Sequence, residues 1–134
     1  MKKHWLMLAI ASTCFVAGQA GAMTSDEYKV SKEKIEADYK VAMTQCKTMK
    51  DNAKDVCEKD AKGKQDVAKA ELEQQYKPSE SNARSVEEEK VKAHYEVAKE
   101  RCGDQSGAAK SACEKQAEAD QAKGKADIKA MKKM

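Results

Sequence analysis

The chain has 134 residues, of which 37% are charged and only 4% aromatic, and its formal net charge is +3. This length allows one small domain or two very small ones and excludes a large enzyme. The small net charge excludes a strongly basic nucleic-acid-binding protein, so no nucleic-acid partner is expected.

Residues 1–22 have the pattern of a secretory signal peptide. Lys2 and Lys3 form a positive start, a short apolar stretch covers residues 5–16, and Ala-Gly-Ala at residues 20–22 is a small-residue cleavage site. The apolar stretch is too short to span a bilayer as a permanent helix. We therefore expect export to the periplasm of a Gram-negative bacterium and a mature chain that begins at Met23.

The mature chain is nearly neutral and poor in aliphatic residues. Two of the 26 Lys and Arg residues leave with the signal, which leaves 24 against 23 Asp and Glu residues. Leu, Ile and Val together number only ten after residue 22. A conventional globular core is therefore excluded.

Four cysteines remain after removal of the signal, which contains Cys14. An even number of cysteines in a small exported protein predicts two disulfides. The four residues are Cys46, Cys57, Cys102 and Cys113.

An internal repeat relates the two halves of the mature chain. The spacing Cys-x10-Cys occurs twice with an offset of 56 residues, and Tyr39, Val41 and Ala42 have identical partners at the same offset. Composition alone does not place tyrosines and cysteines in register, so this pattern indicates a duplication. Residues 78–82 contain the only proline and several turn-forming residues. The predicted organisation is a signal peptide at 1–22, a first repeat at 23–77, a linker at 78–82 and a second repeat at 83–134.

Each repeat has the apolar periodicity of an α-helix, followed by a break. The break is Gly-rich at residues 103–107, whereas at residues 47–52 Asn52 is expected to cap the returning helix. Apolar residues recur at steps of three, four and seven before each break. From these stripes, which include Tyr28, Ala42 and Met49, we take as candidate interaction seam Ile35, Tyr39, Val91 and Tyr95.

The break favours one of the alternative disulfide pairings. On one unbroken helix, residues eleven apart lie about 16 Å apart, too far for a disulfide. The favoured fold is all-α, with two tandem disulfide-stapled helical hairpins and the pairs Cys46–Cys57 and Cys102–Cys113. One long antiparallel helical hairpin, with Cys46–Cys113 and Cys57–Cys102, is the alternative, and parallel pairing of the two repeats also stays open.

The pattern Tyr-x6-Cys-x10-Cys-Glu, followed by an Ala/Lys/Glu-rich helix, covers about residues 33–128. It resembles a group of uncharacterised small exported proteobacterial proteins, some of which are labelled TolA-like cell-envelope proteins. The resemblance implies an envelope compartment and a helical build, and it offers no catalytic residue to carry over.

No pattern of reactive residues indicates an enzyme. The sequence contains no nucleophile elbow, Gly-rich phosphate loop or H-E-x-x-H motif. The cysteine spacing is not that of a zinc knuckle, and the single mature histidine, His94, has no partner in the other repeat. We therefore expect no catalytic residue, no metal and no cofactor.

Three functions are compatible with these features. The favoured one is a non-enzymatic periplasmic structural or interaction protein linked to envelope stress, whose partner is another protein or a second copy. The alternatives are a hydrophilin-like stress protectant and a cysteine-based metal or redox binder. The lysines of residues 123–134 would suit an anionic membrane surface, but we favour their interaction with the helix dipole.

Overall fold

The computed structural model describes residues 22–132, so the predicted signal peptide lies outside the described residues except for Ala22. The elements are α1 (Ser25–Cys46), α2 (Asp51–Tyr76), α3 (Glu80–Arg101), a short 3-10 helix η1 (Cys102–Asp104) and α4 (Gly107–Met131). Over this range the chain forms no strand. The disulfides join Cys46 to Cys57 and Cys102 to Cys113. The predicted all-α fold of two tandem stapled hairpins is confirmed.

Side chains cap the first helix of each hairpin. Before α1, the hydroxyl of Thr24 accepts a hydrogen bond from the backbone N–H of Glu27 at 3.2 Å, and the Glu27 carboxylate accepts one from the Thr24 N–H at 2.8 Å. These hydrogen bonds stabilise the ionised form of Glu27 and lower its pKa. Before α3, the Ser79 hydroxyl accepts from the backbone N–H of Asn82 at 3.0 Å. Each hairpin therefore has a defined start.

The second helix of the first hairpin starts differently from the sequence-based prediction. The N-cap of α2 is Lys50, which makes no side-chain capping hydrogen bond, so the expected Asn52 cap is wrong. Asn52 lies in the first turn of α2, next to the turn of the other hairpin. A Cβ atom placed on Gly103 would be 2.9 Å from Asn52 Oδ1. The two stapled turns are thus in contact with each other.

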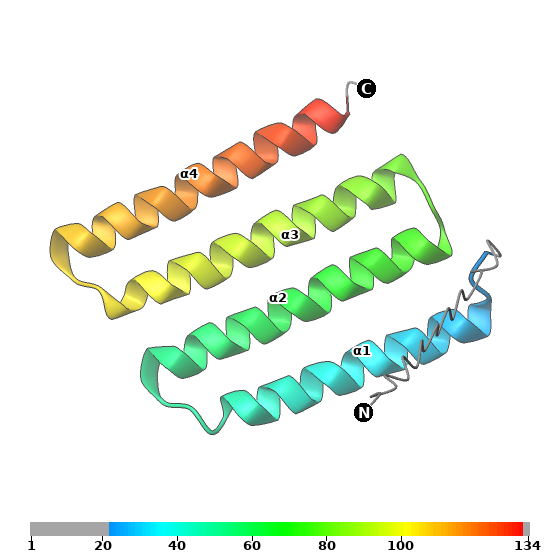
Figure 1. The fold of residues 1–134 in the computed structure, drawn as a ribbon, viewed down its shortest axis with the longest axis horizontal. Helices are drawn as coiled ribbons and strands as arrows, with labels where there is room; N and C mark the ends of the chain where they lie inside the picture. Colours follow the sequence, from blue (N-terminus) through cyan, green and yellow to red (C-terminus); the bar gives the residue numbers. More distant parts are fainter. Residues whose placement is uncertain (1–21, 133–134) are drawn as a thin grey trace, which may run out of the picture.

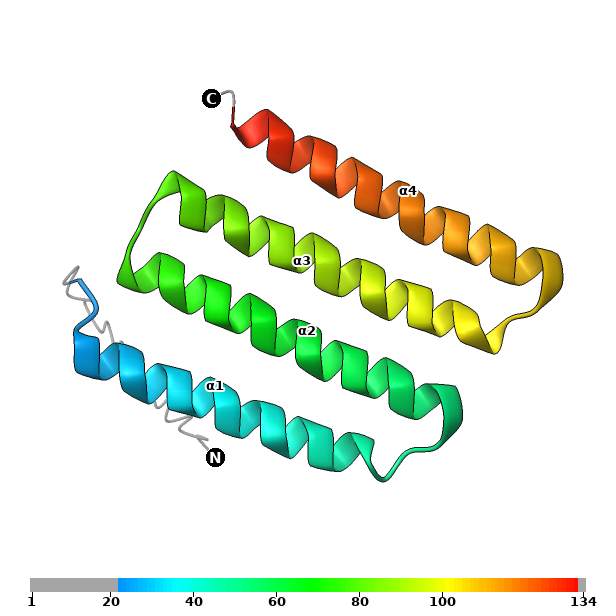
Figure 2. The ribbon, with the colours of Figure 1, turned by 180° about the vertical axis from the view of Figure 1, so that it is seen from behind.

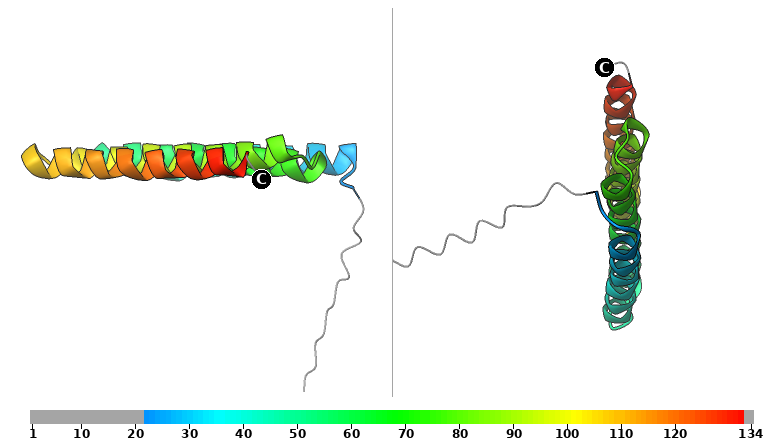
Figure 3. Two further views of the ribbon diagram at one scale, coloured as in Figure 1. Left: turned by 90° about the horizontal axis from the view of Figure 1, so that it is seen from above. Right: turned by 90° about the vertical axis from the view of Figure 1, so that its right-hand side faces the viewer.

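The four long helices lie side by side in one antiparallel layer, in the order α1, α2, α3, α4 (Figures 1 and 2). Extensive contacts join only helices that follow one another in the chain, and those between α2 and α3 are the most extensive. The edge-on views show that the layer is one helix thick (Figure 3). The two hairpins are therefore packed against each other, while α1 and α4 form the outer edges.

Both stapled turns lie at the same end of the layer, and the α2–α3 turn lies at the other end (Figure 1). Few side chains of the layer are buried. No charged or polar side chain is buried among the described residues. Buried apolar residues lie between helices rather than in a central core, and they are Cys46, Ala61, Leu72, Val86, Val97, Cys102, Ala117 and Ile128.

Candidate functional site

The four cysteines form two structural staples at the hairpin turns. The Cα atoms are 5.4 Å apart in Cys46–Cys57 and 5.7 Å apart in Cys102–Cys113, within the range of ordinary disulfides. Cys46 and Cys102 are fully buried. In this state the four sulfur atoms carry no free thiolate for metal binding or exchange.

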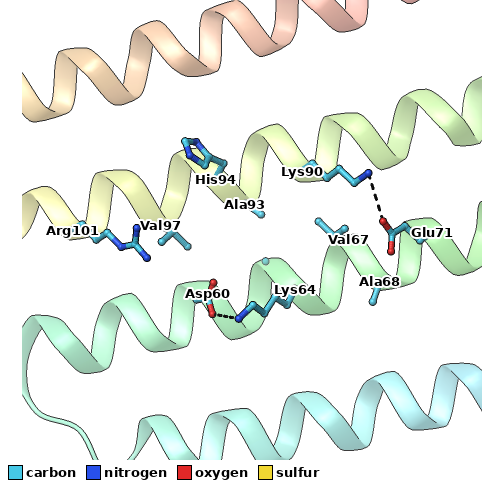
Figure 4. A pocket seen from close by; sticks show the side chains of 11 residues that line it. Asp60, Lys64, Val67, Ala68, Glu71, Lys90, Ala93, His94, Val97 and Arg101 are labelled. Carbon is cyan, nitrogen blue, oxygen red and sulfur yellow. Dashed lines mark ion pairs between the residues drawn. The ribbon is translucent and has the colours of Figure 1, made fainter. Parts of the chain in front are cut away.

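A groove lies between α2 and α3, and we call it the α2–α3 groove (Figure 4). Its volume is about 480 Å³. Gly63 and Ala93 line this groove, and because Gly63 has no side chain, α2 approaches α3 closely at Ala93. The floor is apolar and includes Val67 and Val97. The remaining lining residues are Asp60, Lys64, Ala68, Glu71, Lys90, His94 and Arg101.

Ion pairs occupy much of the charged rim of the groove. Lys64 Nζ lies 2.6 Å from Asp60 Oδ2 within α2, and Lys90 Nζ lies 3.6 Å from Glu71 Oε1 across the two helices (Figure 4). Lys90 also pairs with Glu87 at 3.0 Å. The pKa of Lys90 is raised, chiefly by the hydrogen bond to Glu87, with a smaller contribution from the charge of Glu71. The groove therefore has an apolar floor between largely neutralised rims.

His94 and Arg101 are the remaining polar groups of this rim, and both are exposed. Among the described residues, neither forms a salt bridge within 4 Å, and His94 forms no side-chain hydrogen bond. These two side chains lie beside an apolar floor and can donate hydrogen bonds to acceptor groups of a bound partner. The arrangement is suited to recognition of an amphipathic segment.

The predicted seam residues of the first repeat lie at the interface of their own hairpin. Ile35 and Tyr39 are half-buried and line a hollow of about 230 Å³ between α1 and α2. Lys64 and Ala68 line both this hollow and the α2–α3 groove, so the two open on the same face of the layer. This face is called the groove face below.

The seam residues of the second repeat lie at the corresponding interface between α3 and α4. A Cβ atom placed on Gly124 of α4 would be 2.5 Å from Val91 Cγ2. Tyr95 lines a hollow together with Lys110 and Glu114 of α4. The four seam residues are therefore not gathered into one site, because each pair packs within its own hairpin and stays half-buried.

The sequence analysis missed two exposed valines on α1. Val30 is 66% exposed and Val41 is 59% exposed. The repeat did not reveal this exposure, because the offset of 56 residues pairs Val30 with Val86 and Val41 with Val97, which are of the same residue type. Val86 and Val97 are only 7% and 9% exposed. The same residue types thus have opposite environments in the two repeats.

Basic side chains gather where the C-terminal part of α4 meets the start of α3. Arg84, Lys125 and Lys129 line a hollow of about 410 Å³ together with Glu88, Ile128 and Lys132. The Lys123 ammonium is 2.9 Å from Asp127, and the hydrogen bond between them raises the pKa of Lys123. No helix within residues 22–132 is long and apolar enough to cross a membrane.

Comparisons with known proteins do not extend this description. No family model, curated protein or solved structure matches the chain. Within the range that the structure describes, no group of three or more His, Cys, Asp or Glu residues is arranged to hold a metal ion. The functional argument therefore depends on the layer itself, its faces and its edges.

Proposed function

We propose that this chain is an exported, non-enzymatic structural or interaction protein of the periplasm. The observation that carries the proposal is the open single layer of helices, which leaves two faces and two outer edges available to partners. A soluble protein of this size would ordinarily close its helices around a core. A layer held by staples and left open is suited to binding along its length.

The compartment is supported by two observations. Disulfides persist in oxidising compartments, and both cysteine pairs have disulfide geometry. Helix α1 is capped by Thr24, two residues after the predicted cleavage site, so removal of residues 1–22 leaves the capping box intact. Removal of the predicted signal peptide would therefore leave the start of α1 unchanged.

The α2–α3 groove is the favoured surface for a protein partner. An amphipathic helix bound in a groove places its apolar side chains on the floor and its polar ones at the rim. The half-buried Val67 and Ala68 supply such a floor beside the buried Val97, and His94 and Arg101 supply free donors at the rim. The occupant we propose is an amphipathic helix of another envelope protein with acidic residues along its border.

Two measurements test this function. Intact mass of protein from the periplasmic fraction should correspond to residues 23–134 with four hydrogens missing, and a species that retains Met1 would contradict export. A photo-crosslinking amino acid at His94 in living cells should give a discrete adduct with a second protein. The matched control is Lys92, which is exposed on the other side of the Gly63–Ala93 contact. Equal labelling from both sites would contradict a role for the groove.

A hydrophilin-like protectant is the second candidate, and the small number of buried side chains favours it. The two candidates differ in the state of the dilute protein. An interaction protein should show the full circular dichroism spectrum of helices when oxidised and dilute. A protectant should show weak helicity that rises on drying or in a helix-inducing solvent.

A further inference from the structure

Comparison of the two repeats distinguishes residues that are buried in both hairpins from residues that are buried in only one. Six of the eight buried apolar residues form three pairs related by the offset of 56 residues, namely Cys46 with Cys102, Ala61 with Ala117, and Leu72 with Ile128. These positions are buried in both hairpins, so they belong to the interface within each hairpin.

Val86 and Val97 are buried only in the second hairpin. They lie on the same stripe of α3 as Ala93, at spacings of seven and four residues. Ala93 contacts Gly63 of α2. The neighbour that covers this stripe is therefore α2, the helix that precedes α3 in the chain. On the equivalent side of α1, the described residues place no helix, because α1 packs only against α2 on its other side.

Among residues 22–132, no helix covers the equivalent stripe of α1. Val30, Ala37 and Val41 correspond to Val86, Ala93 and Val97, and we call them the α1 edge. All three are exposed. Isolated exposed valines are ordinary on a protein surface, but these two occupy the positions that bind a helix in the other repeat.

The outer side of α4 is the equivalent of the α2 surface that covers α3. Gly63 corresponds to Ala119, and the positions seven residues before and after it correspond to Ala112 and Ala126. We call these three alanines the α4 edge, and all are exposed. Small side chains at a spacing of seven allow another helix to approach closely and receive larger apolar side chains.

One ion pair between α2 and α3 has equivalents of the same charges on the α1 and α4 edges. Lys90 and Glu71 pair across α3 and α2, and their equivalents are Lys34 on α1 and Asp127 on α4. In the free chain these two residues pair within their own helices, with Asp38 and Lys123. An intermolecular contact would let them pair with each other.

The second interhelical ion pair is not preserved. Lys59 and Glu96 are 3.1 Å apart, whereas their equivalents, Lys115 and Lys40, have the same charge. Ala119 in place of Gly63 also keeps the helices further apart. A contact between the two edges should therefore be weaker than the contact between α2 and α3.

We propose that the α4 edge of one copy binds the α1 edge of a second copy, so that the layer continues from molecule to molecule as it continues from hairpin to hairpin. This proposal goes beyond the function proposed above, because it adds a second copy of the chain as a partner and uses the two outer edges rather than the α2–α3 groove. Because the two edges differ, the contact is heterologous and each added copy presents a fresh edge. The assembly grows as a ribbon of helices or closes into a ring.

The test uses two variants of the disulfide-bonded mature chain, each with one edge blocked. Val30→Lys with Val41→Lys blocks the α1 edge, and Ala119→Lys with Ala126→Lys blocks the α4 edge. Sedimentation from micromolar to millimolar concentration should show wild-type association and two monomeric variants. An equimolar mixture of the variants should give a 1:1 dimer and nothing larger, because one free edge of each kind remains.

Two further variants keep the test decisive. Met49→Lys replaces an exposed apolar residue in the α1–α2 turn, 44% exposed, and should associate like the wild type. Lys40→Glu removes the like-charged pair with Lys115 and should tighten association by roughly twofold to fivefold. Helical circular dichroism confirms that each variant is folded.

Three results would overturn the proposal. They are a monomeric wild type at every concentration, a mixture of the two blocked variants that stays monomeric, and a variant with a blocked α4 edge that still dimerises through α1 alone. None of these results bears on export or on crosslinking from His94, so the proposed function could survive the loss of this inference.

Discussion

Asp51 and Gly107 occupy equivalent positions in the two repeats, and both have a positive φ, of 51° and 59°. Each is the first residue of the helix that returns after a stapled turn. This left-handed conformation suits glycine, is tolerated by aspartate and is unfavourable for most other residues. The two turns therefore have the same backbone geometry although their sequences differ.

The first prediction concerns this shared geometry. A Cβ atom on Gly107 would meet nothing within 4 Å, so substitutions there act through the backbone alone. Gly107→Asp should cost less than about 1 kcal/mol, because Asp51 adopts the same conformation, whereas Gly107→Val should cost about 2 kcal/mol. Thermal unfolding followed by circular dichroism measures both. Equal costs for the two variants would contradict this explanation of the turn.

The second prediction concerns the contact between Gly63 and Ala93. A Cβ atom on Gly63 would be 2.7 Å from the Cβ of Ala93, closer than two non-bonded carbon atoms normally approach. Gly63→Ala gains about 1 kcal/mol of helix propensity but should lose more by forcing the helices apart, for a net cost of about 1 kcal/mol. Ala93→Gly should cost about 1 kcal/mol through propensity alone.

The double variant with both substitutions is the control for this contact. It moves the methyl group from one helix to the other and should unfold close to the wild type. Additive costs in the double-mutant cycle, measured by chemical denaturation, would show that the two residues do not limit the approach of α2 and α3.

The hairpins could be predicted from sequence because their signals are local. The Gly-rich break after Cys102 and the spacing of eleven residues between paired cysteines indicated a fold-back within each repeat, and the disulfides confirm it. The chain turns at Pro78, between α2 and α3, but residues 80–82 of the predicted linker lie in α3, because Ser79 caps the helix and α3 begins at Glu80. The N-cap of α2 was mispredicted because Asp51 takes the left-handed conformation, which moves the helix start ahead of Asn52.

The packing of α2 against α3 could not be predicted, because the repeats carry the same valines on the relevant side. Val30 and Val41 match Val86 and Val97 in type and spacing, and only the order of the helices decides which pair is covered. The α2–α3 groove was missed for the same reason, since its floor joins residues of two repeats. Glycine at position 63 was the one local sign of a close helix approach.

The third prediction uses these valines as a matched pair. Val86→Ala removes buried methyl groups and should lower the free energy of unfolding by about 2 kcal/mol. Val30→Ala, the same substitution at the equivalent exposed position, should change it by less than about 0.5 kcal/mol in dilute solution. Chemical denaturation of both variants at low concentration makes the comparison. A large cost for Val30→Ala under those conditions would mean that α1 has a neighbour even in the monomer.

The fourth prediction concerns pH. The Tyr28 hydroxyl donates a hydrogen bond to the Glu73 carboxylate, and the Tyr28 ring lies 4.5 Å from that of Tyr76, between centroids. The hydrogen bond to Glu73, followed by burial and by the charge of Glu73, raises the pKa of Tyr28. A raised pKa means that this contact contributes its full stability below the ordinary tyrosine pKa near 10 and loses it as pH rises through the higher folded value.

Ultraviolet absorbance of tyrosinate during an alkaline titration measures this effect. The wild type should show a late-titrating component, which Tyr28→Phe removes. Glu73→Gln should return that group toward the ordinary pKa without changing the number of titrating tyrosines. A late group that persists in Tyr28→Phe would assign the shift to another residue.

The fifth prediction concerns the two staples, which dominate the stability of so small a core. Each joins residues 11 apart in the chain, and closing such a loop contributes about 3 kcal/mol in the chain-entropy model. Two staples are then comparable with the whole stability of a small domain, about 5–15 kcal/mol. Reduction should sharply lower the helical circular dichroism signal at room temperature. Cys57→Ala with Cys113→Ala should leave the chain largely unfolded.

The two staples can be tested separately as well. Replacing Cys46 and Cys57 together by alanine, or Cys102 and Cys113 together, should each cost about 3 kcal/mol, because the two loops have the same length. If the reduced protein instead keeps its full helical signal and melts cooperatively at the same temperature, the layer is stable without the disulfides. Since eight buried apolar residues are too few to supply that stability, the missing contacts would have to come from another copy. Melting would then depend on protein concentration.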